Sequence, residues 1–241
     1  TPPRMQYFAI RGGYLIMKEI FQFLRALRRH NDREWFRAHK AEYEEANARF
    51  EALVGELLRR LGDTDEGLLR REPKELTYKL MRDTRFSADK SPYLPAFRAH
   101  LSSGGKQPVP VGYYLMIMPF GRSFLGGGLF CDVFKGATEM VRGYIAAHSD
   151  EWSRIIGDEE FCASFAVKGA ALKKVPAGYA PEHPQAEYLK HKSWYLEYPV
   201  SDDQVRKTDY FLSLAETIFR KMKPFNDFLN RALSKFEMPQ R

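Results

Sequence analysis

The chain has 241 residues, of which 44% are hydrophobic and 14% aromatic, and this is enough apolar material for a sizeable packed core. Its 38 Lys and Arg residues outnumber its 31 Asp and Glu residues and give a net charge of +7. An excess of this size permits contacts with anions without requiring nucleic acid. Nucleic acid is therefore a partner that the charge allows but does not favour.

Composition also bears on the compartment and the domain organisation. No stretch approaches the roughly 18 apolar residues of a membrane-spanning helix, so we expect no membrane partner. Two cysteines, Cys131 and Cys162, are too few for a disulfide framework and favour a cytoplasmic location. Residues 1–16 are predicted to be an N-terminal extension and residues 17–241, which contain no long linker, a single domain. The sequence does not indicate an oligomeric state.

The N-terminal part of the chain predicts a helical hairpin. Apolar side chains recur at helical spacing over residues 18–29, with arginines on the opposite side. Asn31 stands three residues before Glu34, which is the spacing of a capping box. A long second helix is predicted to follow and to end at Gly62, a favoured C-terminal residue.

The middle of the chain predicts short strands. Residues 76–81 have the length of a strand, and residues 113–118 and 123–130 flank a turn at residues 119–122. The latter two segments therefore predict an antiparallel hairpin.

The second half of the chain returns mainly to helix. Asp132 is placed to cap a third long helix. Shorter elements are then predicted as helices at residues 151–156 and 159–165 and as strands at residues 172–175 and 194–199. Pro224 is expected to separate the last two helices, because proline interrupts helical hydrogen bonding. The predicted fold class is α+β, with a long N-terminal helical hairpin and C-terminal helices around a small, mainly antiparallel sheet.

The most highly charged segment runs from Lys79 to Tyr93 and reads KLMRDTRFSADKSPY. Its charged side chains are Lys79, Arg82, Asp83, Arg85, Asp89 and Lys90. Ser91 followed by Pro92 is typical of a helix start, so we predict a short helix here that includes His100. Free amides at a helix start, together with the helix dipole, favour negative charge. The segment therefore predicts an anion pocket beside the two arginines.

Two interpretations of this segment remain open. In the first, Arg82 and Arg85 hold a phosphate- or carboxylate-bearing small molecule, Lys90 and Tyr93 complete the site, and the protein binds or chemically transforms such a molecule. The two aspartates then orient the guanidinium groups or, alternatively, hold a metal. In the second, arginines and aspartates form a structural ion-pair clamp in a non-enzymatic module for a protein or nucleic-acid partner. On either interpretation, Arg82 and Arg85 should lie within hydrogen-bond reach of an aspartate or a shared anion.

The segment also resembles the signature of a family found in bacteria and fungi and called domain of unknown function 2461. The resemblance extends over residues 18–233. Its further landmarks are the strings at residues 31–36, 126–129, 178–179, 183–184 and 224–229. The chain departs from the family pattern at Lys79, usually an arginine, and at Leu94, often a basic residue; a lysine supplies a point charge rather than a planar fork. The family has no established activity, so the resemblance implies a grouping and neither a cofactor nor a catalytic residue.

Three further features have weaker functional interpretations. Gly126–Gly128 lack the spacing of a phosphate-binding loop, so a close backbone contact is the preferred explanation. His100 could act as an acid or base in the expected pocket, although a packed or solvated histidine is favoured. The spacing of His183 and His191 matches no metal-binding template, so no metal site is predicted.

Overall fold

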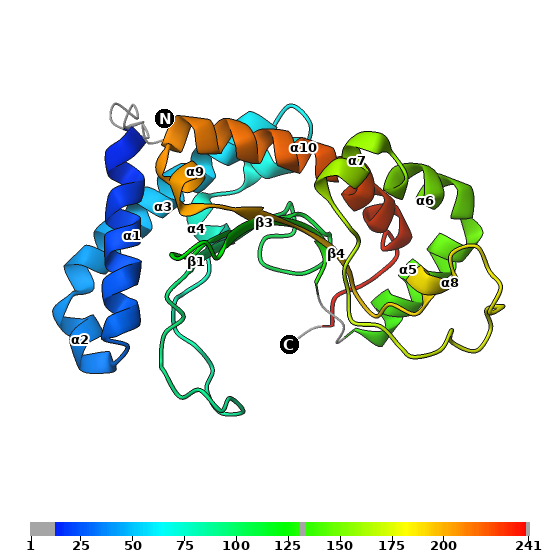
Figure 1. Ribbon diagram of the computed structural model, residues 1–241, viewed down its shortest axis with the longest axis horizontal. Coiled ribbons are helices and arrows are strands. Elements are labelled where there is room, and N and C mark those ends of the chain that lie inside the picture. The colour runs from blue at the N-terminus through cyan, green and yellow to red at the C-terminus, as the bar shows by residue number, and fades with distance from the viewer. Residues whose placement is uncertain (1–12, 131–133, 240–241) are drawn as a thin grey trace.

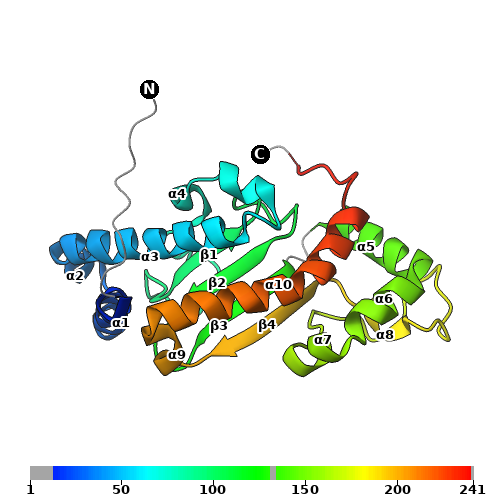
Figure 2. The same cartoon turned by 90° about the horizontal axis from the view of Figure 1, so that it is seen from above.

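The computed structural model describes residues 13–130 and 134–239, arranged around one four-stranded sheet (Figures 1 and 2). Its helices are α1 (Gly13–Arg29), α2 (Arg33–Ala38), α3 (Lys40–Leu61), the 3-10 helix η1 (Glu66–Arg70), α4 (Pro73–Leu76), α5 (Lys135–Ala147), α6 (Ser149–Ile156), α7 (Glu159–Ser164), α8 (Ala186–Leu189), α9 (Asp202–Arg206) and α10 (Thr208–Ala232). Its strands are β1 (Phe97–Leu101), β2 (Tyr113–Ile117), β3 (Ser123–Leu129) and β4 (Trp194–Val200).

The sheet has the order β1-β2-β3-β4, and every neighbouring pair is antiparallel. Short extended segments lie along both of its edges. Thr77 pairs with Ala99 of β1, and Lys168 pairs with Tyr195 of β4. The mainly antiparallel sheet predicted from the sequence is confirmed, and so is the α+β class.

Helices cover one face of the sheet and leave the other face without a helical layer (Figure 1). Seen from above, α10 lies over the sheet and runs roughly along its strands, with α3 on the same face (Figure 2). The helices α1 and α2 stand at one end of the sheet, and α5 to α8 gather at the other end (Figure 1). Within the described residues, none of the helices combines the length and apolarity needed to span a bilayer.

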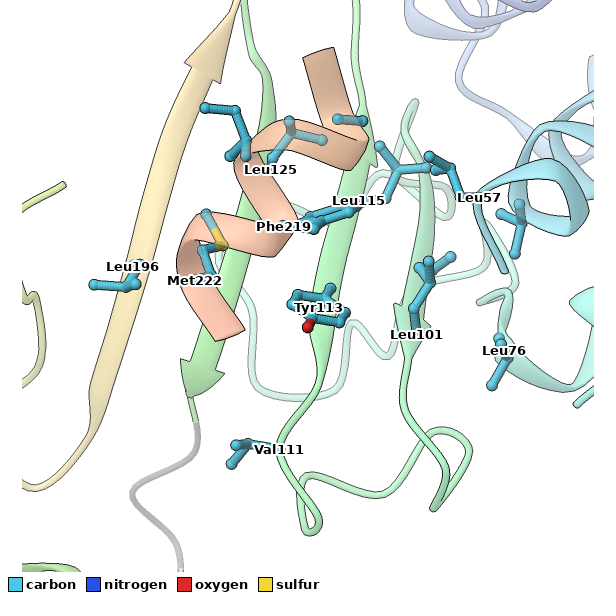
Figure 3. Close-up of a cluster of buried hydrophobic side chains, with 14 of the residues drawn as sticks. Leu57, Leu76, Leu101, Val111, Tyr113, Leu115, Leu125, Leu196, Phe219 and Met222 are labelled. Carbon is cyan, nitrogen blue, oxygen red and sulfur yellow. The ribbon is translucent and has the colours of Figure 1, made fainter. Parts of the chain in front are cut away.

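The core lies between the covered face and these helices (Figure 3). Alternate strand residues point into it, as the two-residue period of a strand requires. The labelled side chains are Leu101, Val111, Tyr113, Leu115, Leu125 and Leu196 from the sheet and its loops, and Leu57, Leu76, Phe219 and Met222 from the helices. Each apolar side chain of this size contributes about 1.5–3 kcal/mol when it is fully buried.

Two glycines of β3, Gly127 and Gly128, allow α10 to approach the sheet closely. A Cβ on Gly127 would lie 3.0 Å from the sulfur of Met222, and one on Gly128 would lie 2.8 Å from a ring carbon of Phe225. Gly128 also has a φ of +94°, which side-chain-bearing residues rarely adopt. The preferred explanation of these glycines as a close backbone contact is therefore confirmed.

The expected break at Pro224 does not occur, because α10 runs through it from Thr208 to Ala232. Pro224 is exposed, so the carbonyl of Arg220 that loses its helical partner faces water. The buried stripe from Phe211 to Leu229 stays in phase across the proline. Packing of this stripe on the sheet therefore outweighs the local preference of proline.

The N-terminal helices also differ from the prediction. The first helix begins at Gly13 rather than near residue 18, and the second is divided into α2 and α3 at His39, whose backbone leaves the helical conformation. Asp32 rather than Asn31 caps α2, because its Oδ1 accepts a hydrogen bond from the Trp35 amide at 2.8 Å. The expected capping box at Asn31 and Glu34 is therefore wrong.

Two predicted strands and one predicted helix are also corrected. Residues 97–101 form β1 rather than a helix, since Phe97, Ala99 and Leu101 face the core and five residues are too few to distinguish the two periods. Residues 76–81 end α4 and continue as an extended segment, and residues 172–175 form no strand. The expected cap at Asp132 lies outside the described residues.

Replacing Gly128 with alanine should destabilise the fold more than the same change at Gly105. Both residues have positive φ, which costs an alanine about 1–2 kcal/mol. A Cβ at Gly105 meets nothing within 4 Å, whereas at Gly128 it would lie 2.4 Å from the Trp194 carbonyl oxygen. We expect Gly128→Ala to lose at least about 2 kcal/mol more than Gly105→Ala in urea unfolding. Equal losses would contradict the close packing of Trp194 and Phe225 around Gly128.

Candidate functional site

Residues 77–99 form a two-stranded ribbon that continues from the edge of the sheet. The amide of Tyr78 donates to the carbonyl of Arg98 at 2.9 Å, and the amide of Leu94 donates to the carbonyl of Leu80 at 2.8 Å. Figure 1 shows this ribbon leaving the sheet on the uncovered side. The Lys79 to Tyr93 segment is thus the outer half of the ribbon and its tip, and it does not join a strand to a helix as predicted.

Arg82 fixes the tip of the ribbon, defined here as residues 83–91. Its Nη1 donates to Asp89 at 2.5 Å and to the Ser91 hydroxyl at 2.9 Å, and its Nη2 donates to the Ser87 hydroxyl at 3.2 Å. Asp89 also accepts from the amide and hydroxyl of Ser91 at 2.9 and 2.5 Å. These bonds cross-link both sides of the tip, so Arg82 and Asp89 act as a clamp.

Hydrogen bonds from the Ser91 hydroxyl and amide, followed by those from Arg82, hold the pKa of Asp89 well below its usual range. A carboxyl whose pKa is lowered by folding stabilises the folded form at neutral pH. The stabilisation from Asp89 is lost as the pH falls from the ordinary pKa of an aspartate, near 4, through the lowered pKa of Asp89. The clamp is therefore an acid-sensitive element of the tip.

Arg85 and Asp83 form a second, separate pair. Two guanidinium nitrogens of Arg85 donate to Asp83, at 2.6 Å for the shorter contact, and the backbone amide of Arg85 donates to the same carboxylate. Both side chains are mostly exposed, and the hydrogen bonds from Arg85 lower the pKa of Asp83. The expected hydrogen-bond reach of both arginines to an aspartate is confirmed, but each arginine has its own aspartate.

Asn31 attaches the ribbon to the corner between α1 and α2. Its Nδ2 donates to the Tyr93 carbonyl at 2.8 Å, and its Oδ1 accepts from the Tyr93 amide at 3.0 Å. The ring of Tyr93 is buried and stacks on Phe36 of α2, with the ring centroids 4.2 Å apart. The contact joins two charged strings of the sequence that are about sixty residues apart.

A cavity of about 360 Å³ lies where the ribbon meets this corner. Its lining residues are Asn31, Asp32, Arg33, Met81, Arg82, Thr84, Lys90, Pro92 and Tyr93. Lys90 donates to the Thr84 carbonyl at 3.0 Å, and among the residues that the structure describes no carboxylate forms an ion pair with it. Within the described part of the chain, Arg33 makes no ion pair.

The structure separates the predicted site residues into two groups. Arg82, Lys90 and Tyr93 line the cavity, whereas Lys79, Asp83, Arg85 and Asp89 do not. Lys79 is exposed, and its carbonyl accepts a hydrogen bond from Arg98 at 3.1 Å. The anion pocket expected at a helix start is wrong, because residues 91–96 are not helical.

Sequence reasoning missed Arg33 and Thr84 as lining residues. Arg33 stands two residues after Asn31, in a string that was interpreted structurally only as a helix start. The available signal was the family landmark at residues 31–36, which has the same charged character as the ribbon segment. Local pattern could not place the two strings together, because only tertiary packing does so.

His100 lies elsewhere than expected. It is a buried residue of β1, and its Nδ1 donates to the Gly105 carbonyl at 3.1 Å. Burial lowers the pKa of His100 to about 4. The histidine is therefore neutral and packed, which agrees with the favoured interpretation, and it faces the uncovered side of the sheet rather than the Lys79 to Tyr93 segment.

Metal ligands do not gather in the described residues: no three His, Cys, Asp or Glu side chains there are placed to hold an ion. Cys162 is exposed and unpaired, and Cys131 lies outside the described residues.

Comparison with known proteins provides the family. A model of the family described as "Conserved hypothetical protein (DUF2461)" matches residues 19–228. The chain belongs to the DUF2461 family. Neither the search of curated proteins nor that of solved structures finds a match. The DUF2461 match contains the ribbon, the α1–α2 corner and the cavity between them, together with all four strands.

Arg82 and Arg85 should respond differently to substitution by glutamine. Arg82→Gln removes the bonds that cross the tip, so amide hydrogen exchange in residues 83–91 should accelerate markedly. Arg85→Gln removes only an exposed local pair and should leave this exchange nearly unchanged. Mass-spectrometric exchange on the peptides that cover the tip measures both. Equal acceleration in the two variants would show that Arg82 is not the clamp.

His100 should make the fold sensitive to moderate acid. Because its folded pKa of about 4 lies below the ordinary value of 6.5, the unfolded chain binds the proton first and stability falls with pH between these values. The loss amounts to as much as about 3 kcal/mol, at about 1.4 kcal/mol per pH unit. Urea unfolding at several pH values should show a shallower decline in His100→Gln. The same decline in both proteins would mean that other groups cause it.

Proposed function

We propose that the protein binds a small anionic molecule, carrying a phosphate or carboxylate group, in the cavity between the ribbon and the α1–α2 corner. The observation that supports this most directly is the pair of cations, Arg33 and Lys90, that line the cavity without a carboxylate partner. Cations that lack a carboxylate partner at a cavity favour a ligand of opposite charge.

The charge of the cavity is favourable for such a ligand. Arg82 is neutralised by Asp89, which leaves Arg33 and Lys90 against the single lining carboxylate of Asp32. Asp32 already accepts the hydrogen bond of the Trp35 amide. The remaining positive charge stands beside polar hydrogen-bonding groups, including the hydroxyl of Thr84.

The rigidity of the walls supports binding as well. The clamp at Arg82 fixes one wall, and the two hydrogen bonds of Asn31 fix that wall relative to the other. A preorganised site loses less conformational entropy when a ligand binds. The volume of about 360 Å³ lies at the lower end of the range for small-molecule sites and fits a sugar phosphate or a dicarboxylate.

The test is ligand-dependent thermal stability of the wild-type protein and of Arg33→Gln and Lys90→Gln. The ligand panel contains inorganic phosphate, sugar phosphates, mononucleotides and dicarboxylates. A bound anion at a hundredfold excess over its dissociation constant should stabilise the wild type by about 2.7 kcal/mol. Both variants should lose most of this stabilisation while keeping the melting temperature of the free protein.

Arg85→Gln is the matched control, because Arg85 carries the same charge on the same tip but does not line the cavity. It should respond to the anion as the wild type does. If no anion in the panel stabilises the wild type, or if the cavity variants respond as well as Arg85→Gln, the segment serves as a structural clamp and this proposal is wrong.

A further inference from the structure

The uncovered face of the sheet bears a cluster of aromatic side chains, which we call the ring face and define as Tyr78, Tyr114, Phe124, Phe130 and Tyr195. Antiparallel register places Tyr114 beside His100 and Gly126, and Tyr195 beside Gly128. Tyr114, Phe124 and Tyr195 alternate with the buried residues Leu115, Leu125 and Leu196, so they point away from the core. A cavity of about 360 Å³ lies over this face.

Gly126 makes room for one of these rings. A Cβ on Gly126 would lie 2.8 Å from the Cζ of Phe130, so only a glycine lets this ring fold back onto the sheet. The Phe130 ring stacks on Tyr195, with centroids 4.6 Å apart, and lies 5.5 Å from the ring of Tyr114. Phe130 nevertheless remains 38% exposed, so the cluster presents ring surface to solvent.

Cations surround the rings. The guanidinium of Arg98 and the ammonium of Lys106 lie 5.4 and 6.0 Å from the ring centre of Tyr78. Lys168 pairs with Tyr195 at the other edge and reaches Glu197 at 2.8 Å. Glu197, the carboxylate that lines this cavity, is therefore already neutralised. The face combines stacking surfaces with a net positive charge.

We infer that the ring face binds single-stranded nucleic acid, with bases stacked on its rings and phosphates beside Arg98 and Lys106. Aromatic rings with cations along one groove are the features that sequence-tolerant single-strand binding requires. The rings extend from the ribbon across β2 to β4, a span wider than a single base. A free nucleotide would use one ring at most. A duplex is excluded sterically, since its bases are stacked inside and cannot reach the rings. This inference does not rest on the proposed anion site.

Fluorescence anisotropy with labelled single strands of twelve thymidines or uridines tests the inference. Affinity should fall with salt between about 50 and 200 mM, and the slope of log K against log salt should be about −1.4 for two phosphate contacts at about 0.7 each. Phe130→Ala should weaken binding at least about fivefold, the lower limit for one base–aromatic stack. Lys106→Gln should reduce the slope by about 0.7.

Two matched controls lie away from the ring face. Tyr210, which is 52% exposed on α10, and the exposed Lys135 of α5 offer an aromatic and a cation for the same types of substitution. Tyr210→Ala and Lys135→Gln should bind like the wild type. Each variant is used only if its circular dichroism and melting temperature match those of the wild type. Lys106→Gln alters only an exposed side chain and keeps the test valid if Phe130→Ala fails to fold.

Three outcomes would overturn the inference. The first is the absence of binding to any single strand at the lowest salt. The second is displacement of the labelled strand by a mononucleotide as readily as by an unlabelled strand of twelve, which would assign the cavity to a free nucleotide. The third is an equal loss of affinity in the ring-face and control variants, which would indicate general attraction by the net charge of the protein.

Discussion

The close contact between α10 and the glycines of β3 determines how the rest of the structure is arranged. With no side chains at Gly127 and Gly128, the helix lies directly on the strand, and its long apolar stripe covers one face of the sheet. Two asparagines of α10 strengthen the contact: Asn226 donates to the Gly112 carbonyl at 3.1 Å, and Asn230 pairs with both backbone groups of Val111. The helices α10 and α3 lie over the same face of the sheet, and among the described residues no helix covers the opposite face. The hydrophobic core therefore lies on one face of the sheet only, as far as the described residues show.

The ribbon of residues 77–99 projects from the edge of the sheet and is the second main feature of the fold. Its stem extends the sheet by backbone pairing, and its charged tip is stabilised by its own side chains rather than by the core. Such a projection would normally move independently of the helices. Here Tyr93, two residues beyond the tip, stacks on Phe36 and pairs with Asn31, so the ribbon and the α1–α2 corner are connected directly. The charged strings interpreted separately in the sequence are the two walls of one cavity.

Much of the fold was predictable, because long periodic segments and clear turns determine it locally. The stripe from Phe211 to Met222 and the hairpin of β2 and β3 are such cases. Short segments were not predictable: Phe97–Leu101 satisfies helical and strand periods equally, and only packing on α3 and pairing with β2 decide. That Arg82 and Arg85 would each reach an aspartate followed from sequence proximity, but which aspartate each one pairs with did not. The inclusion of Arg33 in the cavity, and the gathering of rings from the ribbon, β2, β3 and β4, depended on register and chain reversal, which no local pattern contains.

The two asparagines that each bind one residue's backbone have a consequence for how this sequence can diverge. Asn31 and Asn230 each present a carboxamide to the N–H and C=O of a single residue, as a neighbouring peptide unit would. The hydrogen bonds place no demand on the side chains of Tyr93 and Val111. They do require asparagine at the other end, since aspartate lacks the donor and glutamine is one carbon too long. Among related chains, we therefore expect the residues at positions 93 and 111 to vary as far as packing allows. We expect Asn31 and Asn230 to be retained.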